Sequence, residues 1–287
     1  MEHLFRYFLI GYARMCDYMD PISPQSLGTL LADLRARRPL VHHITNAVTM
    51  NDCANVTLAI GAAPVMAEAM EEIGEMVGLA DALVLNIGTL SRQQILSMTE
   101  AGHCANRKGI PVILDPVGAG ATSLRTASAL MLLEELKISV LKGNAGEIGV
   151  LAGADAQVRG VDSWGVSGDI VTIAKSLAKE RRIVVAVSGV VDVITDGART
   201  VYVSNGHEML GRLSGTGCMV ASLTGAFSAV SKDHMAAAAG AFTAFGIAGE
   251  QAASAGNGPY AFRTALVDRI AALSSEDIAG QAQIRTG

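Results

Sequence analysis

The sequence has few aromatic residues, few cysteines and no block of positive charge. Aromatic residues make up 4% of the 287 positions, although hydrophobic residues together make up 50%. The four cysteines (Cys16, Cys53, Cys104 and Cys218) are widely spaced without a CxxC pair, which argues against a zinc site and a disulfide framework. The formal net charge of −5 argues against nucleic acid or an anionic membrane surface as the main partner. We therefore expect a cytoplasmic protein whose main partner is a small molecule.

No stretch predicts a membrane span or a signal peptide. The apolar run Leu4–Ile10 is too short to cross a bilayer and lacks a small-residue cleavage pattern. We expect residues 1–24 to be an extension outside the core, with Met15 and Met19 as alternative translation starts. Residues 25–287 are expected to form a single domain, and two domains are the alternative, because α/β domains often reach this length.

Apolar runs of strand length alternate with helical patterns through the first two thirds of the chain. Helices are expected at Leu27–Arg38, Val48–Ile60, Ser91–Lys108 and Asp169–Arg181, and Glu68, Glu71, Glu72 and Glu75 suggest one more solvated helix face. Strands are expected at Pro39–Thr45, Ala63–Met66, Ala82–Ile87, Pro111–Leu114 and Ile138–Lys142. This alternation predicts a three-layer α/β/α fold with a mostly parallel central sheet.

The pattern changes after residue 182. Three apolar runs, Ile183–Val187, Asp192–Thr195 and Thr200–Val203, are separated only by turns, which indicates hairpins at an antiparallel edge of the sheet. An excursion is expected at Val161–Gly168. From Gly217 to about Leu273 the pattern is helical, with one break at Gly256–Pro259.

The turn Gly215-Thr216-Gly217-Cys218 is a candidate anion site. Glycines allow positive φ and close approach to a ligand, and the first N–H groups of the following helix have no partner within it. A thiol at a helix start is expected to have a lowered pKa, which makes Cys218 a candidate base or nucleophile. A plain glycine-rich helix start is the alternative.

Two acids and a lysine are expected at the same edge of the sheet. Asp115 ends a buried strand, and Glu147 opens a helix just after another strand. Two carboxylates beside a phosphate cradle suit Mg²⁺, which prefers oxygen ligands and keeps several waters. Lys142 ends its strand nearby and is placed to neutralise phosphate charge. The alternatives are turn or capping roles for the acids and a plain strand-end lysine.

Together these motifs resemble the ribokinase-like small-molecule kinases and, within them, the hydroxyethylthiazole kinases of thiamine salvage. The resemblance spans residues from about 27 to 270. The stretches that carry it, in the family's order, are Leu40–Asn46, Leu58–Met66, Asn86–Thr89, Asp115–Gly118, Lys142–Glu147, Ser188–Asp192 and Gly215–Cys218.

The resemblance implies an activity and a set of site residues. It implies transfer of phosphate from ATP to the hydroxyethyl alcohol of a thiazole, in a homotrimer with active sites between subunits. Asp115 and Glu147 would hold Mg²⁺ largely through waters, and Lys142 and Ser188 would contact the ATP phosphates. The anion hole would be lined by Gly215, Thr216 and Gly217, and the thiazole pocket by Asn46, Met66 and Gly215. Cys218 stands where most ribokinase-like kinases carry an aspartate base.

Three positions depart from the family's pattern. Lys142 is usually arginine, Ser188 usually threonine and Gly146 usually serine. Lysine keeps the charge but loses bidentate geometry, so weaker nucleotide binding is expected. Two rival functions remain. A kinase of a hydroxymethylpyrimidine would lack the cysteine and the Pro-Val-Met pocket. A non-catalytic nucleotide-binding module would lack one of the acids or the glycine turn.

His42 and His43 occupy adjacent strand positions on opposite faces, so together they predict no metal site.

Overall fold

The computed structural model describes residues 22–153, 170–255 and 258–287, in which nine strands form one sheet. The strands are β1 (Leu40–Ile44), β2 (Ala63–Met66), β3 (Ala82–Asn86), β4 (Val112–Asp115), β5 (Val140–Asn144), β6 (Val184–Ser188), β7 (Asp192–Thr195), β8 (Thr200–Val203) and β9 (Ile284–Thr286). Their order is β2-β1-β3-β4-β5-β6-β7-β8-β9. Pairing is parallel from β2 to β6 and antiparallel from β6 to β9. The predicted mostly parallel sheet with an antiparallel edge is confirmed.

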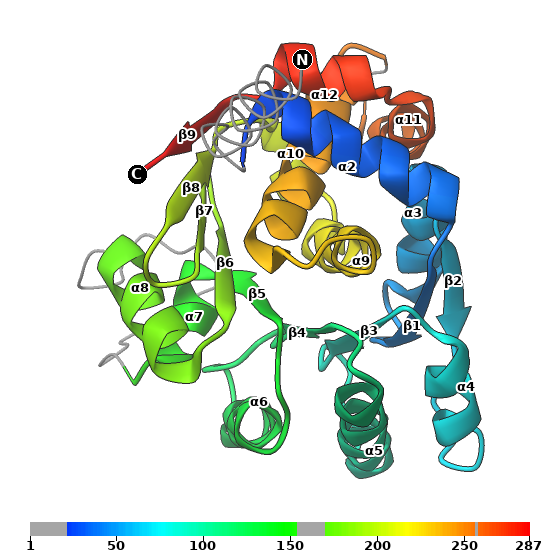
Figure 1. Ribbon diagram of the computed structural model, residues 1–287, viewed down its shortest axis with the longest axis vertical. Coiled ribbons are helices and arrows are strands. Elements are labelled where there is room, and N and C mark those ends of the chain that lie inside the picture. Colours follow the sequence, from blue (N-terminus) through cyan, green and yellow to red (C-terminus); the bar gives the residue numbers. More distant parts are fainter. Residues whose placement is uncertain (1–21, 154–169, 256–257) are drawn as a thin grey trace, which may run out of the picture.

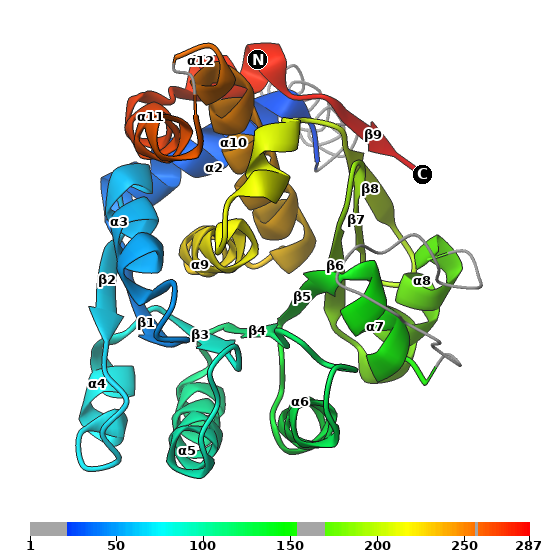
Figure 2. The ribbon, with the colours of Figure 1, turned by 180° about the vertical axis from the view of Figure 1, so that it is seen from behind.

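Helices cover both faces of this sheet (Figures 1 and 2). On one face lie α4 (Ile73–Leu79), α5 (Arg92–Lys108), α6 (Ser123–Glu135), α7 (Ala145–Leu151) and α8 (Ile170–Arg181). On the other lie α2 (Pro24–Arg37), α3 (Met50–Ile60), α9 (Thr216–Ser228), α10 (His234–Ala253), α11 (Pro259–Ala272) and α12 (Ser275–Gln281), with the short 3₁₀ helix η1 (Glu208–Arg212) before α9. The three-layer arrangement is therefore the predicted one.

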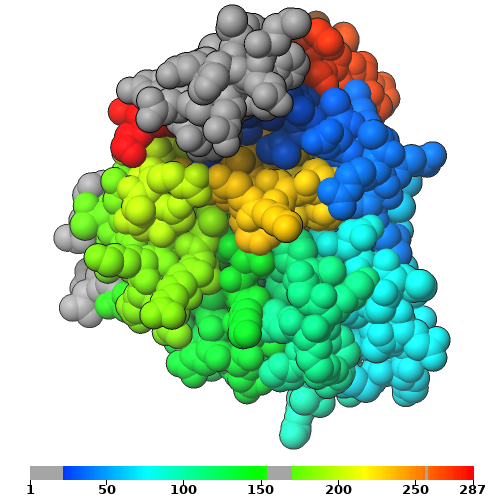
Figure 3. Space-filling model, in the orientation of Figure 1, coloured from blue at the N-terminus to red at the C-terminus, as the bar shows by residue number. Residues whose placement is uncertain are grey.

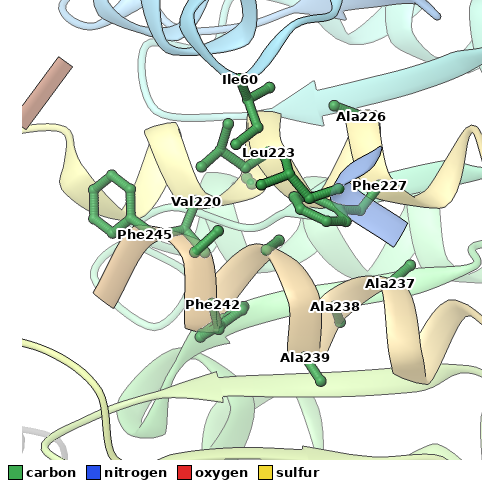
Figure 4. Packing of buried hydrophobic residues seen from close by; sticks show 14 of the residues in the cluster. Ile60, Val220, Leu223, Ala226, Phe227, Ala237, Ala238, Ala239, Phe242 and Phe245 are labelled. Carbon is green, nitrogen blue, oxygen red and sulfur yellow. The ribbon is translucent and has the colours of Figure 1, made fainter. Parts of the chain in front are cut away.

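Helices α9 and α10 form the centre of the second layer and are buried over almost their whole length. Figure 4 shows Leu223 and Phe227 of α9 packed beside Ala237 and Ala238 of α10. Small residues permit close approach on two sides of α9: a Cβ on Gly240 of α10 would lie 3.1 Å from Phe227 Cδ1, and a Cβ on Gly225 of α9 would lie 2.6 Å from Val84 Cγ2 in the sheet. Alanine and glycine thus pack around the few phenylalanines of this core. The packing also fixes where α9 begins, at the carboxyl edge of the parallel strands.

The carboxyl-terminal third contains more elements than its pattern predicts. The continuous helix expected after Gly217 is interrupted between α9 and α10, where the Asp233 carboxylate accepts hydrogen bonds from the N–H groups of Met235 and Ala236 and caps α10. Figure 3 shows this golden end of α10 at the surface, between blue and green parts of the chain. Helix α12 and strand β9 follow Leu273 and were not predicted. The expected break before Pro259 is present, although Gly256 and Asn257 lie outside the described residues.

The expected acidic helix face is wrong for Glu68 and Glu71. Helix α4 begins only at Ile73, because the preceding stretch is bound to α5 instead: Ser97 Oγ donates to the Glu68 carbonyl, and Gln94 Nε2 donates to the Glu68 carboxylate. The expected excursion at 161–168 lies outside the described residues.

The first described helix is α2. Ser23 caps this helix, with Pro24 at its first position, while residues 1–21 lie outside the described part of the chain. Within that described part, no helix is both long enough and apolar enough to cross a membrane.

Candidate active site

The parallel strands bring polar side chains to one edge of the sheet. Asn86 ends β3 and pairs in register with Asp115, which ends β4. Lys142 lies near the end of β5, and Asn46 follows β1 by two residues. All four side chains are buried, and α9 begins beside them. This is the position where open α/β sheets bind ligands.

The start of α9 provides unpaired backbone donors. Gly215 precedes the helix with φ of +92°, a conformation that favours glycine, and no side chain caps this end. The Thr216 hydroxyl turns back to donate to the Leu210 carbonyl. A Cβ on Gly217 would lie 2.8 Å from Lys142 Nζ, so the absence of a side chain lets the ammonium reach the helix start. N–H groups and a cation therefore converge on one spot, as an anion site requires.

Lys142 is the cation that pairs with Asp115 at this edge, while the Arg125 guanidinium donates to the carbonyls of Ile87, Gly88 and Val117 nearby. Its Nζ lies 3.6 Å from Asp115 Oδ1. Burial lowers the pKa of Lys142, but the charges of Asp115 and Glu147 outweigh it and raise the pKa above its ordinary value. Burial raises the pKa of Asp115 to about 6, against the opposing effect of Lys142. An excess of negative charge thus surrounds a single ammonium.

Glu147 has both a capping and a site position. Its N–H donates to Asn144 Oδ1 and its Oε2 accepts from the Asn144 N–H, which closes a capping box at the start of α7. Its Oε1 accepts from the Gly118 N–H at 2.8 Å, in the loop that follows Asp115. The capping alternative for Glu147 is therefore realised, and the same carboxylate ties two loops of the site together.

The donor set fits a metal ion that retains water. Asp115 Oδ1 is buried and has no hydrogen-bond partner, so it has a lone pair available. Both oxygens of Glu147 already accept backbone N–H groups. Among the described residues, no group of three or more His, Cys, Asp or Glu side chains is placed to hold a metal. Two carboxylates with water completing the shell suit Mg²⁺ better than a metal that needs an all-protein cage.

Cys218 lies in the third position of α9 and is nearly buried. Asn46 Nδ2 donates to its Sγ at 3.3 Å. The expectation that the helix start lowers the thiol pKa is wrong: burial raises the pKa of Cys218 and the Asp115 charge raises it further, while hydrogen bonding and the charge of Lys142 lower it only in part. The thiol form therefore predominates at neutral pH.

The remaining predicted residues lie at the same edge but farther along it. Ser188 ends β6 in register with Asn144, and its Oγ donates to the Gly143 carbonyl at 3.3 Å. Met66 ends the edge strand β2, in register with His43, and is half-buried. Within the described part of the chain, no hydrogen bond joins either side chain to the Asn46, Asp115 and Cys218 group, and their contacts with ligands stay predictions.

The two adjacent histidines of β1 have separate partners. His42 Nε2 lies 2.6 Å from the Ala67 carbonyl, and His43 Nδ1 lies 3.0 Å from the Val41 carbonyl. Complete burial lowers the pKa of His43 to about 4. Both histidines are therefore neutral at pH 7, and their hydrogen bonds help to hold the ends of β1 and β2 in place.

Two site residues were missed by the sequence analysis. Asn86 hydrogen-bonds to Asp115, and Asp192 accepts from the Gly189 N–H at 2.9 Å while burial raises its pKa to about 7. The signal for Asn86 was present, because a polar residue ends a buried apolar strand beside Asp115. Asp192 opens a hairpin strand, where an acid is an ordinary turn residue, so no comparable signal marked it.

Comparison with known proteins agrees with this geometry. A sequence model of the Hydroxyethylthiazole kinase family matches residues 31–276. The hydroxyethylthiazole kinase of Methanocella arvoryzae is 59% identical over 261 residues, which cover 91% of this chain and 98% of that relative. The solved structure of the hydroxyethylthiazole kinase protein from Pyrococcus horikoshii OT3 superposes with a TM-score of 0.84 at 46% identity, covering 91% of this chain and 98% of that one. A ribokinase-like superfamily protein from Enterococcus faecalis has a TM-score of 0.61 at 13% identity, covering 85% of this chain and 89% of that one, which shows a shared fold.

The fold, the uncapped helix start and the buried acid–lysine group define a kinase of the ribokinase-like class. A family model covers most of the chain, and relatives with more than half of the aligned residues identical match about nine tenths of it. These matches narrow the class to one family. The chain belongs to the hydroxyethylthiazole kinase family.

Proposed function

We propose that this enzyme transfers the γ-phosphate of ATP to the hydroxyethyl oxygen of 4-methyl-5-(2-hydroxyethyl)thiazole, giving the thiazole phosphate used in thiamine phosphate synthesis. The alcohol oxygen forms a bond to the γ-phosphorus, the bond to the β-phosphate oxygen breaks, and ADP leaves. The observation that carries the proposal is the convergence of the uncapped α9 start, Lys142 and the Asp115 carboxylate on one spot. Positioning and charge stabilisation supply most of the rate in such transfers.

The nucleotide phosphates are proposed to lie against the start of α9. The N–H groups of Gly215, Thr216 and Gly217 face the transferring group there, and Lys142 neutralises phosphate charge beside them. Ser188, at the end of β6, is proposed to contact the same phosphates. Lysine in place of the family's usual arginine supplies one point charge in a fully buried position.

Mg²⁺ is proposed to be held by Asp115 and Glu147. The Oδ1 of Asp115, which accepts no hydrogen bond, and the several carboxylates around the Lys142 ammonium support this assignment. When bound, Mg²⁺ would supply positive charge that neutralises the charge developing on the nucleotide phosphates. Lys142 keeps Asp115 ionised before the metal arrives, because it lowers a carboxyl pKa that burial raises.

The acceptor alcohol is proposed to lie between Asn46, Met66 and Gly215. The Asn46 amide is held in one orientation, because its Oδ1 accepts the Thr49 N–H at 3.0 Å and its Nδ2 donates to Cys218 Sγ. Cys218 is thereby placed to orient the substrate hydroxyl and, in its thiolate form, to accept the hydroxyl proton.

A homotrimer is proposed, with the active sites between subunits. Strand β2 is an edge of the sheet, all four of its residues are only half-buried, and it carries Met66. Val48 and Leu58 are 68% and 57% exposed at and near the helix α3 that packs on this strand. A second chain would cover this apolar edge and complete the pocket.

A cytoplasmic location is proposed because Cys53, Cys104 and Cys218 are free thiols.

The proposal is tested by measuring ADP release from Mg·ATP with a panel of alcohols. We expect the thiazole alcohol to stimulate release strongly, and a thiazole without the hydroxyl to have no effect. A hydroxymethylpyrimidine serves as the control for the rival kinase activity. Absence of stimulation by the thiazole alcohol would overturn the proposed function, and selective stimulation by the pyrimidine would favour the rival.

A further inference from the structure

Asn86 contacts Asn46, on the proposed acceptor side of the site, and Asp115, on the proposed phosphate side. It ends β3 and is 1% exposed. Its Nδ2 donates to Asp115 Oδ2 at 2.6 Å, and its Oδ1 accepts from Asn46 Nδ2 at 2.9 Å. The Gly88 N–H also donates to Oδ1 at 2.9 Å. Because a backbone N–H fixes which end of the amide is the oxygen, the nitrogen must face the carboxylate.

The hydrogen bonds around Asn86 form a chain that runs in one direction. The N–H and hydroxyl of Thr49 both donate to Asn46 Oδ1 at 3.0 Å. Asn46 then donates to Asn86 and to Cys218 Sγ, and Asn86 donates to Asp115. Each amide therefore accepts hydrogen bonds at its oxygen and donates from its nitrogen in the direction of Asp115. Hydrogen bonds aligned in this way polarise one another. The chain starts at backbone anchors and ends on the thiol and the carboxylate.

A capping or strand-ending role does not account for these contacts. A side chain that served only to end β3 would need its bond to Gly88, and nothing more. Beyond that bond, Asn86 donates to Asp115 at the end of β4 and accepts from Asn46, which follows β1, and both of these residues are buried. An amide is the only ordinary side chain of this size with one acceptor and one donor end, so aspartate and leucine each remove a different part of the arrangement.

We propose that Asn86 is a positioning residue, which holds the Asn46 amide and the Asp115 carboxylate at a set separation and so aligns the acceptor alcohol with the phosphate-binding side of the site. This inference rests on the proposed function, in which Asn46 binds the acceptor alcohol and Asp115 holds Mg²⁺ on the phosphate side. Asn86 touches neither substrate in this arrangement and acts through its two neighbours.

Two variants separate the two contacts. Asn86→Asp keeps the acceptor for Asn46 and Gly88 but sets an oxygen where the amide donated to Asp115. We expect kcat to fall by about 10–100-fold, the range for groups that orient metal ligands, while KM for the thiazole alcohol changes by less than about threefold. Asn86→Leu removes both contacts at similar volume, so kcat should fall and KM should rise together. Leu85→Val, in the same strand, disturbs the apolar core without touching the polar chain and should keep both constants.

A second measurement does not depend on turnover. Alkylation of Cys218 by iodoacetamide without substrates, resolved by peptide mass spectrometry with Cys104 as reference, should slow by several-fold in both Asn86 variants. The reason is that Asn86 holds the Asn46 amide, whose Nδ2 donates to Cys218 Sγ and so favours the thiolate, and a displaced amide leaves less thiolate. Should Asn86→Leu fail to fold, Asn86→Asp keeps both acceptor bonds and carries the test alone.

The outcomes separate this inference from the proposed function. Wild-type kcat and KM in a folded Asn86→Asp protein would overturn the positioning role, whatever the alkylation rates. If wild-type enzyme fails to phosphorylate the thiazole alcohol, the proposed function fails; slower alkylation of Cys218 in the variants then still supports the positioning role, and unchanged alkylation overturns it as well.

Discussion

At the scale of single residues, the surroundings of Cys218 oppose ionisation of its thiol. Cys218 is the proposed base at the start of α9, yet burial and the Asp115 charge raise its pKa. A positive helix end is a weak, short-range effect, whereas removing a thiolate from water beside a carboxylate costs more. We therefore propose that the thiol orients the alcohol at neutral pH, and that only the minor thiolate fraction acts as a base.

A pH profile of turnover tests this role. Because the thiol pKa is raised, the thiolate fraction grows as pH rises toward and beyond the ordinary range of about 8.5, so kcat of the wild type should rise through that region. Cys218→Asp should keep substantial activity and move this rise to lower pH, since a carboxylic acid ionises first.

Cys218→Ala provides the matched comparison. It should lose part of kcat and lose the rise with pH, because no titrating side chain remains at that position. Abolished turnover in a correctly folded Cys218→Asp protein would contradict the base assignment. An unchanged pH profile in Cys218→Ala would contradict it as well.

At the scale of elements, the start of α9 depends on one backbone conformation. Gly215 has φ of +92°, and a Cβ there would clash with the Thr49 side chain. Thr49 in turn anchors Asn46 through two hydrogen bonds. The turn, the helix start and the acceptor pocket are therefore mechanically linked, although they are far apart in sequence.

Gly215→Ala should reduce both stability and turnover. The left-handed conformation costs a non-glycine residue about 1–2 kcal/mol, and displacing Thr49 adds to that cost. We expect a lower melting temperature and at least about a tenfold loss of kcat/KM, in line with the effect of small displacements at a catalytic site.

Gly211→Ala is the control in the neighbouring helix η1. A Cβ there meets nothing within 4 Å and its φ is not positive, so stability should stay within about 0.5 kcal/mol. Equal behaviour of the two variants in thermal unfolding and kinetics would contradict the role given to Gly215.

At the scale of the whole molecule, the sheet has two different edges. The β9 edge closes the antiparallel side, and the β2 edge carries the proposed acceptor pocket beside exposed apolar side chains. Light scattering in solution should give a particle of three chains of 29.7 kDa each. Leu58→Glu should lower that mass and weaken thiazole binding together, because a charge at a buried interface lacks a partner.

Leu124→Glu is the control, since Leu124 is 63% exposed on α6, away from β2. It should leave both mass and binding unchanged. A monomeric wild type at assay concentration, or loss of assembly only in Leu124→Glu, would contradict the proposed trimer.

Pattern alone predicted most of the architecture. The strand expected at Pro39–Thr45 is observed at Leu40–Ile44, and the one expected at Ala63–Met66 is unchanged. Long buried strands and capped helices have local signals, which explains this agreement. Strand β9 has three residues and forms because β8 offers an unpaired edge, so no local pattern marks it. The stretch Glu68–Glu72 reads as helix, but contacts with α5 hold it as a loop.

The sequence by itself determined the alternation of strands and helices, and with it the edge at which Asp115, Lys142 and Glu147 meet. Parallel strands must end together, so residues that follow them share one edge. Only the tertiary structure decided the protonation of Cys218 and the place of Asn86. Burial and the distances between side chains of different strands arise when the helices pack on the sheet, and these set both the thiol pKa and the direction of the hydrogen-bond chain.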